Sequence, residues 1–294
     1  MLDGEASLAR AGFEIPGQKV GASDMTGTIP VSLAIAGAAE PKKNRKRNYQ
    51  QDNYPAFLSY LQQAAQSGHT FTIGKLRFGG IELGETTLGI RAENGLVEMT
   101  SLKSEFLAGT LLGTGFFRSG EQIQYGADLA LNNLSLRALC SSFPKIKGYI
   151  SGKVDGIANL YGEGKGLNGL IGVINIWTRS APDEKMLVSK DFLQKLAGKK
   201  LKGIFFQNDR PYDHGEIRGY LEKGYLVFDV LDISHTTIFG VRDLSVSVAP
   251  VQNKIAIEHL FNSIKEAASR GKVVGGGGEG AAPAPVETEF KWEE

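Results

Sequence analysis

The sequence predicts a mainly β protein, in which an elongated, curved antiparallel sheet forms an open groove and carries a few short helices and a C-terminal capping helix. Three observations support this fold class. Glycine accounts for 38 of the 294 residues, nearly twice its usual share of ~7%, and it suits tight turns better than helices. Apolar and polar residues alternate over long stretches, as in half-buried strands. Turn signals separate these stretches.

The composition narrows the range of functions. With 33 basic and 32 acidic residues the net charge is +1, so the chain lacks the basic excess of a general nucleic-acid binder. Hydrophobic residues make up 41% of the chain, which is enough for a packed core. The single cysteine, Cys140, excludes an internal disulfide and is predicted to be a small buried hydrophobe.

Residues 1–48 are predicted to hold one strand, at 27–37, and a basic linker. Five of the six residues at 42–47 are Lys or Arg. Such a run is most often a solvated linker, and the alternative is contact with phosphates or anionic lipid headgroups. An amphipathic helix follows over 54–66, because its apolar side chains recur at helical spacing, and Gly68 ends it.

A long β meander with mostly antiparallel neighbours is predicted from Thr70 onward. Its clearest strands are 122–132 and 243–248, where apolar and polar side chains alternate. Turn signals that contain glycine lie between strands at 78–80, 93–95, 118–120, 162–164 and 222–224. The expected strands are 70–78, 81–92, 95–103, 106–118, 121–132, 146–161, 167–178, 202–208, 214–222, 225–232 and 236–249.

Three further helices and a tail complete the expected organisation. A single turn is predicted at 135–140, a helix capped by Ser189 at 189–196, and the longest helix at 252–270, where it covers the end of the sheet. The sheet domain with this terminal helix therefore spans 49–270. Residues 271–294 form an acidic tail rich in Gly, Ala and Pro, which cannot bury a core. Phe290 and Trp292 are its candidate residues for docking on a partner protein, and the alternative is a solvated tail.

The amino-terminal residues carry no secretory signal. Such a signal needs a basic start and an apolar run, whereas residues 1–5 are acidic and polar. The longest apolar stretch, 29–39, is shorter than the ~20 residues of a membrane helix. The chain is expected to be cytoplasmic if it is complete as given, and otherwise to be part of a longer protein.

Enzyme signals are weak, and the chain is predicted not to be an enzyme and to bind no cofactor. No nucleotide-binding loop or nucleophile elbow is present. One polar cluster, Asp213, His214, Asp229, Asp232 and His235, offers metal ligands. Its spacing matches no standard site, so the structural interpretation, without a metal, is preferred. A metal-dependent hydrolase built on Asp213, His214 and His235 is the less favoured alternative.

The apolar side of the sheet is the candidate binding surface. A sheet with one apolar face must cover that face, and the few predicted helices leave part of it free. Such a surface favours binding of lipid tails or of another protein. The alternative is that the face is ordinary covered core. The predicted lining residues are Ile123, Tyr125, Leu129, Leu131, Leu244, Val246 and Val248.

Several segments punctuated by glycine resemble the AsmA-like superfamily. The likeness spans about residues 70–250 and is carried by glycines and apolar positions. The earlier segments resemble the repeats of that family, and the later ones resemble its C-terminal region. The segments are 76–84, 95–99, 106–115, 146–156, 166–172 and 215–228.

The resemblance implies a periplasmic cell-envelope protein of Gram-negative bacteria, tethered to the inner membrane through a part absent from this sequence. It implies that acyl chains lie in an apolar β-groove for phospholipid transport between the inner and outer membranes, without catalytic residues. The alternative is an assembly module for outer-membrane biogenesis that docks envelope partners through a strand edge or the tail. The missing N-terminal anchor and the length, too short to bridge a periplasm, favour a C-terminal fragment.

Overall fold

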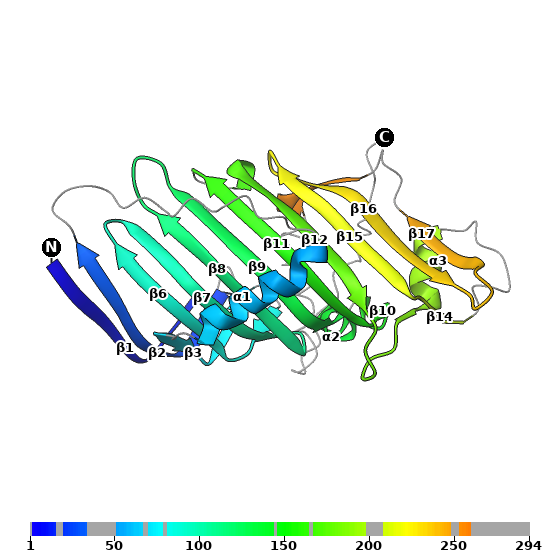
Figure 1. The fold of residues 1–294 in the computed structure, drawn as a ribbon, viewed down its shortest axis with the longest axis horizontal. Helices are drawn as coiled ribbons and strands as arrows, with labels where there is room; N and C mark the ends of the chain where they lie inside the picture. The colour runs from blue at the N-terminus through cyan, green and yellow to red at the C-terminus, as the bar shows by residue number, and fades with distance from the viewer. Residues whose placement is uncertain are drawn as a thin grey trace, which may run out of the picture.

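The computed structural model is built on one large sheet that does not close into a barrel (Figure 1). Its strands lie side by side along the longest axis of the molecule, and helix α1 (Tyr54–Gln66) runs obliquely across one face. The predicted mainly β, antiparallel fold class is therefore confirmed. The structure describes residues 2–15, 20–33, 51–66, 70–78, 81–143, 146–164, 167–197, 208–247 and 253–259.

Fifteen strands make up the large sheet. Among them, only β2 and β6 pair parallel, over a short stretch. Their order is β17-β16-β15-β12-β11-β9-β8-β7-β6-β3-β2-β4-β5, with β1 on β2 and β18 on β16. The strands are β1 (Leu2–Ile15), β2 (Val20–Leu33), β3 (Phe71–Ile73), β4 (Lys75–Phe78), β5 (Ile81–Leu83), β6 (Thr86–Glu93), β7 (Leu96–Phe106), β8 (Gly109–Arg118), β9 (Gln124–Ser135), β11 (Lys153–Glu163), β12 (Leu170–Arg179), β15 (His214–Glu222), β16 (Tyr225–Thr236), β17 (Arg242–Ser247) and β18 (Lys254–Ala256).

The structure confirms the predicted meander at its turns. Asn94-Gly95 joins β6 to β7, and Lys223-Gly224 joins β15 to β16. All four of these residues have positive φ, between 47° and 80°, as the two-residue type I′ hairpin turn requires. The other predicted turns, at 78–80, 118–120 and 162–164, also fall between paired strands.

The structure shows a longer N-terminal hairpin than the single strand predicted at 27–37. Strands β1 and β2 have 14 residues each, and register shifts near Ala11 interrupt their pairing. Because each shift breaks the period of two, the alternation that marks a strand is hidden here. Strand β2 also pairs with β3, β4 and β6, so the sheet continues across the boundary placed at residue 48. The basic run at 42–47 lies outside the described residues.

Helix α1 forms at the predicted residues and packs its apolar side on the sheet. The ring of Tyr54 meets that of Trp177 edge-on, with centroids 5.0 Å apart and planes at 87°. The Tyr54 hydroxyl donates to the carbonyl oxygen of Leu131 at 2.7 Å, and burial raises the pKa of that hydroxyl. The buried cluster comprises Tyr54, Leu61, Leu112, Ala130, Ile157 and Trp177.

Two other predicted helices begin at the serines that cap them. Ser135 Oγ accepts from the Ala138 amide at the start of α2 (Leu136–Ser141). Ser189 Oγ accepts from the Phe192 amide at the start of α3 (Lys190–Ala197). Cys140 of α2 is buried as predicted, and burial raises the pKa of its thiol. Two single-turn helices, η1 (Gln51–Asn53) and η3 (Leu167–Gly169), precede α1 and β12.

A second, small sheet lies beside α3. Its three short strands run in the order β10-β13-β14. The strand predicted at 146–161 is divided at Gly152, with β10 in this small sheet and β11 in the large one, whereas β13 and β14 have two residues each, too few to show an alternation. The three strands are β10 (Ile150–Ser151), β13 (Leu187–Val188) and β14 (Arg210–Pro211).

The prediction of a helix starting at 252 is wrong at its start. Residues Lys254–Ala256 form β18 and pair with β16, where Leu226 lies opposite Ile255. The Asn253 side-chain amide donates to the Phe228 carbonyl at 2.8 Å and holds this strand in register. Helical backbone starts only at residue 257, and residues 260–270 and the tail with Phe290 and Trp292 lie outside the described residues.

The predicted strand at 236–249 also needs correction. Strand β16 runs on to Thr236, a turn spans 237–241, and β17 begins at Arg242. The turn contains apolar residues that continue the strand-like pattern of the sequence. The sequence therefore gives no sign that the chain reverses direction there. Residues 202–207 of another predicted strand lie outside the described residues.

The turn between β7 and β8 offers a test of backbone strain. Leu107 and Ala108 have φ of 47° and 55°, a region that costs a residue with a Cβ roughly 1–2 kcal/mol. Ala108→Gly is expected to raise the free energy of unfolding in urea by about 0.5–1 kcal/mol. Gly224→Ala is the reciprocal control and should lower it, because its Cβ would lie 2.4 Å from Asn168 Oδ1. A loss of stability in Ala108→Gly would contradict this account.

Candidate apolar binding face

The two faces of the large sheet differ in chemistry. Successive side chains of a strand alternate between the faces, and the strand registers show which residues of neighbouring strands share a face. We call the face that packs against α1, through Leu112, Ala130 and Ile157, the helix face. The opposite face is called the apolar face.

The middle of the apolar face contains three cross-strand rows in which every residue is apolar. The first row crosses eight strands, from β6 to β16, through Leu88, Leu102, Gly113, Leu129, Ala158, Ile174, Gly219 and Phe228. The second crosses the same strands through Ile90, Met99, Gly115, Ala127, Leu160, Gly172, Leu221 and Leu226. The third runs from β8 to β16 through Leu111, Leu131, Gly156, Ile176, Ile217 and Leu231. No charged or hydrogen-bonding side chain lies within these three rows. Beyond Leu111 the third row continues into Ser104 of β7 and Thr86 of β6, whose hydroxyl groups are hydrogen-bonded to each other at 2.7 Å.

The helix face is more polar in the corresponding rows. The row that holds the α1 contacts continues into Lys103 on one side and into Asn175 and Arg218 on the other. Two exposed apolar residues, Ile171 and Val173, also lie on this face. Single exposed apolar residues are common on protein surfaces. The apolar face is distinguished by the unbroken extent of its rows.

Glycines within the rows make room for large neighbouring side chains. A Cβ at Gly113 would lie 2.6 Å from Cδ2 of Leu129. A Cβ at Gly156 would lie 3.2 Å from Cδ1 of Leu131 and 3.1 Å from Cγ1 of Ile176. These leucine and isoleucine side chains therefore lie over the neighbouring glycines. Part of the high glycine content serves this close packing on the apolar face.

The ends of the apolar face are covered, and its middle is partly exposed. At the β6 side, Leu88 and Ile90 pack with a cluster from β2 and β3. At the β16 side, Ile257 packs with Leu221 and Leu226. Between these clusters, the large side chains are only partly buried. They are Leu102, Leu111, Leu129, Leu131, Ile176 and Leu231, and Ile217 beside them is 38% exposed.

Four of the predicted lining residues belong to β9 or to its approach. Tyr125, Leu129 and Leu131 lie on the apolar face, where they pair with residues of β8 and β11. Ile123 precedes the strand, and its carbonyl accepts from the Gly164 amide at 2.8 Å. The strand therefore begins one residue after Ile123 and continues to Ser135.

The other predicted lining residues lie elsewhere. Leu244 is buried in a cluster with Val188 and Leu193, and Val246 packs against the same cluster. These two side chains are on the apolar side of the sheet but under α3 and the small sheet, so they form covered core. Val248 lies outside the described residues.

Sequence reasoning missed the part of the apolar face that β12, β15 and β16 contribute. Ile174, Ile176, Ile217 and Leu231 are its main residues. Strand β12 reads Leu-Ile-Gly-Val-Ile-Asn-Ile-Trp, with apolar residues on both faces. A strand of this kind shows no period of two, so its sequence does not tell which side chains share a face. Only the pairing with β11 and β15 reveals it.

The polar cluster resolves into separate pairs. His235 Nδ1 lies 2.5 Å from Asp243 Oδ1, and this hydrogen bond holds the pKa of the Asp243 carboxyl below its usual range. His214 Nε2 lies 3.9 Å from Asp232 Oδ2. Asp213 accepts from a backbone amide of β16 at 2.8 Å. Within the described part of the chain, no three His, Cys, Asp or Glu residues gather in a metal-ligating group.

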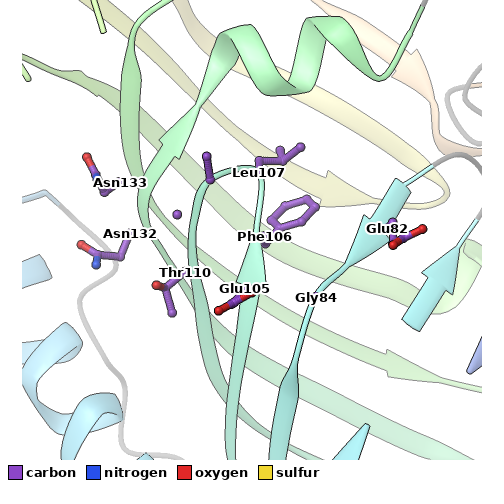
Figure 2. A pocket seen from close by; sticks show the side chains of 10 residues that line it. Glu82, Gly84, Glu105, Phe106, Leu107, Thr110, Asn132 and Asn133 are labelled. Atoms are coloured by element: carbon purple, nitrogen blue, oxygen red, sulfur yellow. The ribbon is translucent and has the colours of Figure 1, made fainter. Parts of the chain in front are cut away.

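A shallow polar hollow of about 570 Å³ lies beside the turn that joins β7 to β8 (Figure 2). Figure 2 shows Glu105 and Thr110 on the adjacent strands β7 and β8, with Asn132 and Asn133 of β9 beside them. Glu82 at its rim forms ion pairs with lysine and arginine of β4. Its lining carries the side chains of Glu82, Glu105 and Thr110 together with two asparagines.

Comparisons with known proteins assign no family. No protein-family model, no curated protein and no solved structure matches the chain. The fold and the surface alone therefore define the class of protein: an open, mainly antiparallel β-sheet protein with long apolar rows on one face. None of the helices in the described part is long and apolar enough to span a bilayer.

Proposed function

We propose that the chain is a lipid-handling segment whose apolar face holds acyl chains. The observation that carries this proposal is the set of three all-apolar rows, two of which cross eight strands without a polar side chain. An acyl chain is long, narrow and without hydrogen-bonding groups. It therefore fits a long surface that has no hydrogen-bonding side chains.

The lack of polar side chains in the rows favours a lipid over a protein partner. Protein interfaces carry about one hydrogen bond per 100–200 Å² and have a polar rim. The rows offer neither feature along the middle of the sheet. The strand backbones are also paired on both sides there, so they leave no free amide for a partner to use.

The mechanism proposed is passive. Each methylene that leaves water for the apolar face contributes ~0.8 kcal/mol, while the phospholipid headgroup stays in water. Small side chains alternate with large ones along the rows, for example Gly113 beside Leu129 and Gly156 beside Leu131. The resulting surface is uneven but nowhere polar, so an acyl chain can shift along it without breaking a specific contact.

This proposal agrees with the resemblance to AsmA-like envelope proteins. Together they lead us to propose a cellular location as well. In that view the chain is periplasmic and tethered to the inner membrane through a part absent from this sequence. It supports phospholipid transport between the inner and outer membranes and has no catalytic role. The polar pairs of His214 and His235 then serve to hold the strands β15, β16 and β17 together.

A charge placed on the apolar face tests the proposal. Ile217 on the apolar face is 38% exposed, and Val173 on the helix face of the adjacent strand is 39% exposed. Ile217→Asp is expected to weaken binding of a fluorescent phospholipid by about tenfold or more, since a carboxylate beside an acyl chain is poorly solvated. Val173→Asp, the matched control, should bind within about twofold of the parent chain. Both are expected to lower the melting temperature by similar amounts, because the two side chains are exposed to the same degree.

Native mass spectrometry of the purified chain gives a second measurement. The parent chain is expected to carry phospholipid, and the Ile217→Asp chain to carry less. If Ile217→Asp and Val173→Asp lost phospholipid binding equally, the acyl chains would not bind specifically to the apolar face, and the proposal would be contradicted. An acyl-free parent chain that binds no added phospholipid would refute the proposal.

A second candidate function rests on the free edge of β1. This strand of 14 residues pairs with β2 alone among the described strands, so its other edge presents unpaired backbone groups. Such an edge can accept a further strand from a partner, which suits an assembly module of the envelope. In this case the purified chain carries no acyl chains, and Ile217→Asp leaves partner binding unchanged.

A further inference from the structure

The turn that joins β16 to β17 exposes three large apolar side chains at its tip. Ile238 is 95% exposed, Phe239 is 85% exposed and Val241 is 60% exposed. The other exposed large apolar residues of the described chain reach at most 50%. We call residues 237–241 the apolar tip. In Figure 1 it is the loop at the end of the β16–β17 hairpin, at the far end of the sheet from β1.

The backbone of the apolar tip is closed by its own hydrogen bonds. The Thr237 amide donates to the Val241 carbonyl at 2.8 Å, and the Gly240 amide donates to the Thr237 carbonyl at 2.8 Å. The Val241 amide also donates to Thr237 Oγ1 at 3.2 Å. Gly240 has φ of 75°, which glycine adopts without strain. This turn points Ile238 and Phe239 away from the protein.

Folding of this chain does not account for the apolar tip. None of its side chains belongs to the buried clusters of the described residues. Polar residues form hairpin turns at least as well, as Asn94-Gly95 and Lys223-Gly224 show in the same sheet. An isoleucine and a phenylalanine in water therefore point to an apolar environment outside the chain.

We propose that the apolar tip inserts into the interfacial layer of a phospholipid bilayer and docks this end of the sheet there. The size of the tip favours a bilayer over a protein partner. A stable protein interface buries at least about 1,200 Å² with shaped contacts, whereas a few apolar side chains suffice to enter the boundary between headgroups and acyl chains. Arg242 follows the tip directly and is exposed, so its guanidinium is placed to meet lipid phosphates.

This inference goes beyond the proposed function, since it concerns a bilayer surface and not single acyl chains on the sheet. The two contacts use different residues. A chain that binds vesicles through the tip but carries no acyl chain would refute the proposed function alone. A chain that carries acyl chains but does not bind vesicles would refute the tip proposal alone.

Co-sedimentation with vesicles of phosphatidylethanolamine and phosphatidylglycerol tests the tip. The full chain with both Ile238→Ser and Phe239→Ser is expected to lose about tenfold or more in partitioning, since apolar burial drives interfacial binding. Ile171→Ser, which changes a 50% exposed residue of the helix face, is the matched control and should bind like the parent. The melting temperature should stay unchanged in all variants. Equal partitioning of the parent chain and the tip variant would overturn the proposal.

A fluorescent label on the apolar tip tests directly whether the tip contacts the bilayer. Ile238→Cys carries an environment-sensitive fluorophore on the tip, and Ser119→Cys carries it on the exposed β8–β9 loop. The native Cys140 is buried and does not compete for the label. Vesicles are expected to shift the emission to the blue at position 238 only. An unshifted emission at 238, or a tip variant that changes oligomeric state but not vesicle binding, would overturn the proposal.

Discussion

Replacing Glu184 with alanine is expected to lower the free energy of unfolding by about 3–5 kcal/mol, since each buried donor left without a partner costs ~1–3 kcal/mol. The buried carboxylate accepts three hydrogen bonds. Ser135 Oγ donates at 2.6 Å, the Gly152 amide at 2.8 Å and the Arg137 amide at 3.1 Å. Glu184 thus holds the first turn of α2 against the start of β11. Its removal leaves the Ser135 and Gly152 donors without this partner in a buried site, and the Arg137 amide without it in a partly buried one.

Urea denaturation of three variants measures this effect. Glu184→Gln keeps one carbonyl acceptor and should lose less stability than Glu184→Ala. Glu163→Ala removes an exposed carboxylate that accepts from Tyr161 and Gln124, and it should change the stability by at most about 0.5 kcal/mol because water replaces the lost partner. Similar losses in Glu184→Ala and Glu163→Ala would show that the buried network adds no more than a surface contact.

The elements with local signals were the ones that the sequence predicted well. Helix α1 shows a period near 3.6, and each cap serine of α2 and α3 stands where its hydrogen bond is made. The Asn-Gly and Lys-Gly turns need positive φ, which few other pairs accept at low cost. These signals arise from the backbone of a few neighbouring residues, so they are visible without the rest of the fold.

The elements that depend on distant partners were missed or misplaced. Lys254–Ala256 is too short to distinguish helical from strand spacing, and its pairing with β16 decides for the strand. The bulged hairpin of β1 and β2 likewise needs its partner to set the register. Strand geometry depends on cross-strand contacts more than on local preference.

The candidate site shows the same division. The alternation of β9 predicts that Tyr125, Leu129 and Leu131 share a face, and the register places all three there. The same argument could not separate them from Leu244, which lies in a covered cluster under α3. Whether an apolar residue is lining or core depends on what packs above it, and that information lies in chain segments far away in the sequence.

The contact between α1 and the sheet is the second place where a large effect is expected. Leu61 is 1% exposed and packs in the cluster on the helix face, while its neighbour Tyr60 is 46% exposed on the same helix. Truncation of a buried leucine removes its burial free energy and leaves a cavity, which together cost about 2–5 kcal/mol. The helix is short, so most of its stability comes from this packing and not from its own hydrogen bonds.

Leu61→Ala is therefore expected to lower the free energy of unfolding by about 2–5 kcal/mol, and Tyr60→Ala by at most ~1 kcal/mol. Both variants keep helix propensity, because alanine is the best helix former. Urea denaturation followed by the fluorescence of Trp177 measures the difference, since this ring contacts Tyr54 at the start of α1. If Leu61→Ala were no more destabilising than Tyr60→Ala, α1 would not be anchored on the helix face through Leu61. The separation of the sheet into a face covered by α1 and an opposite apolar face would then lose its main support.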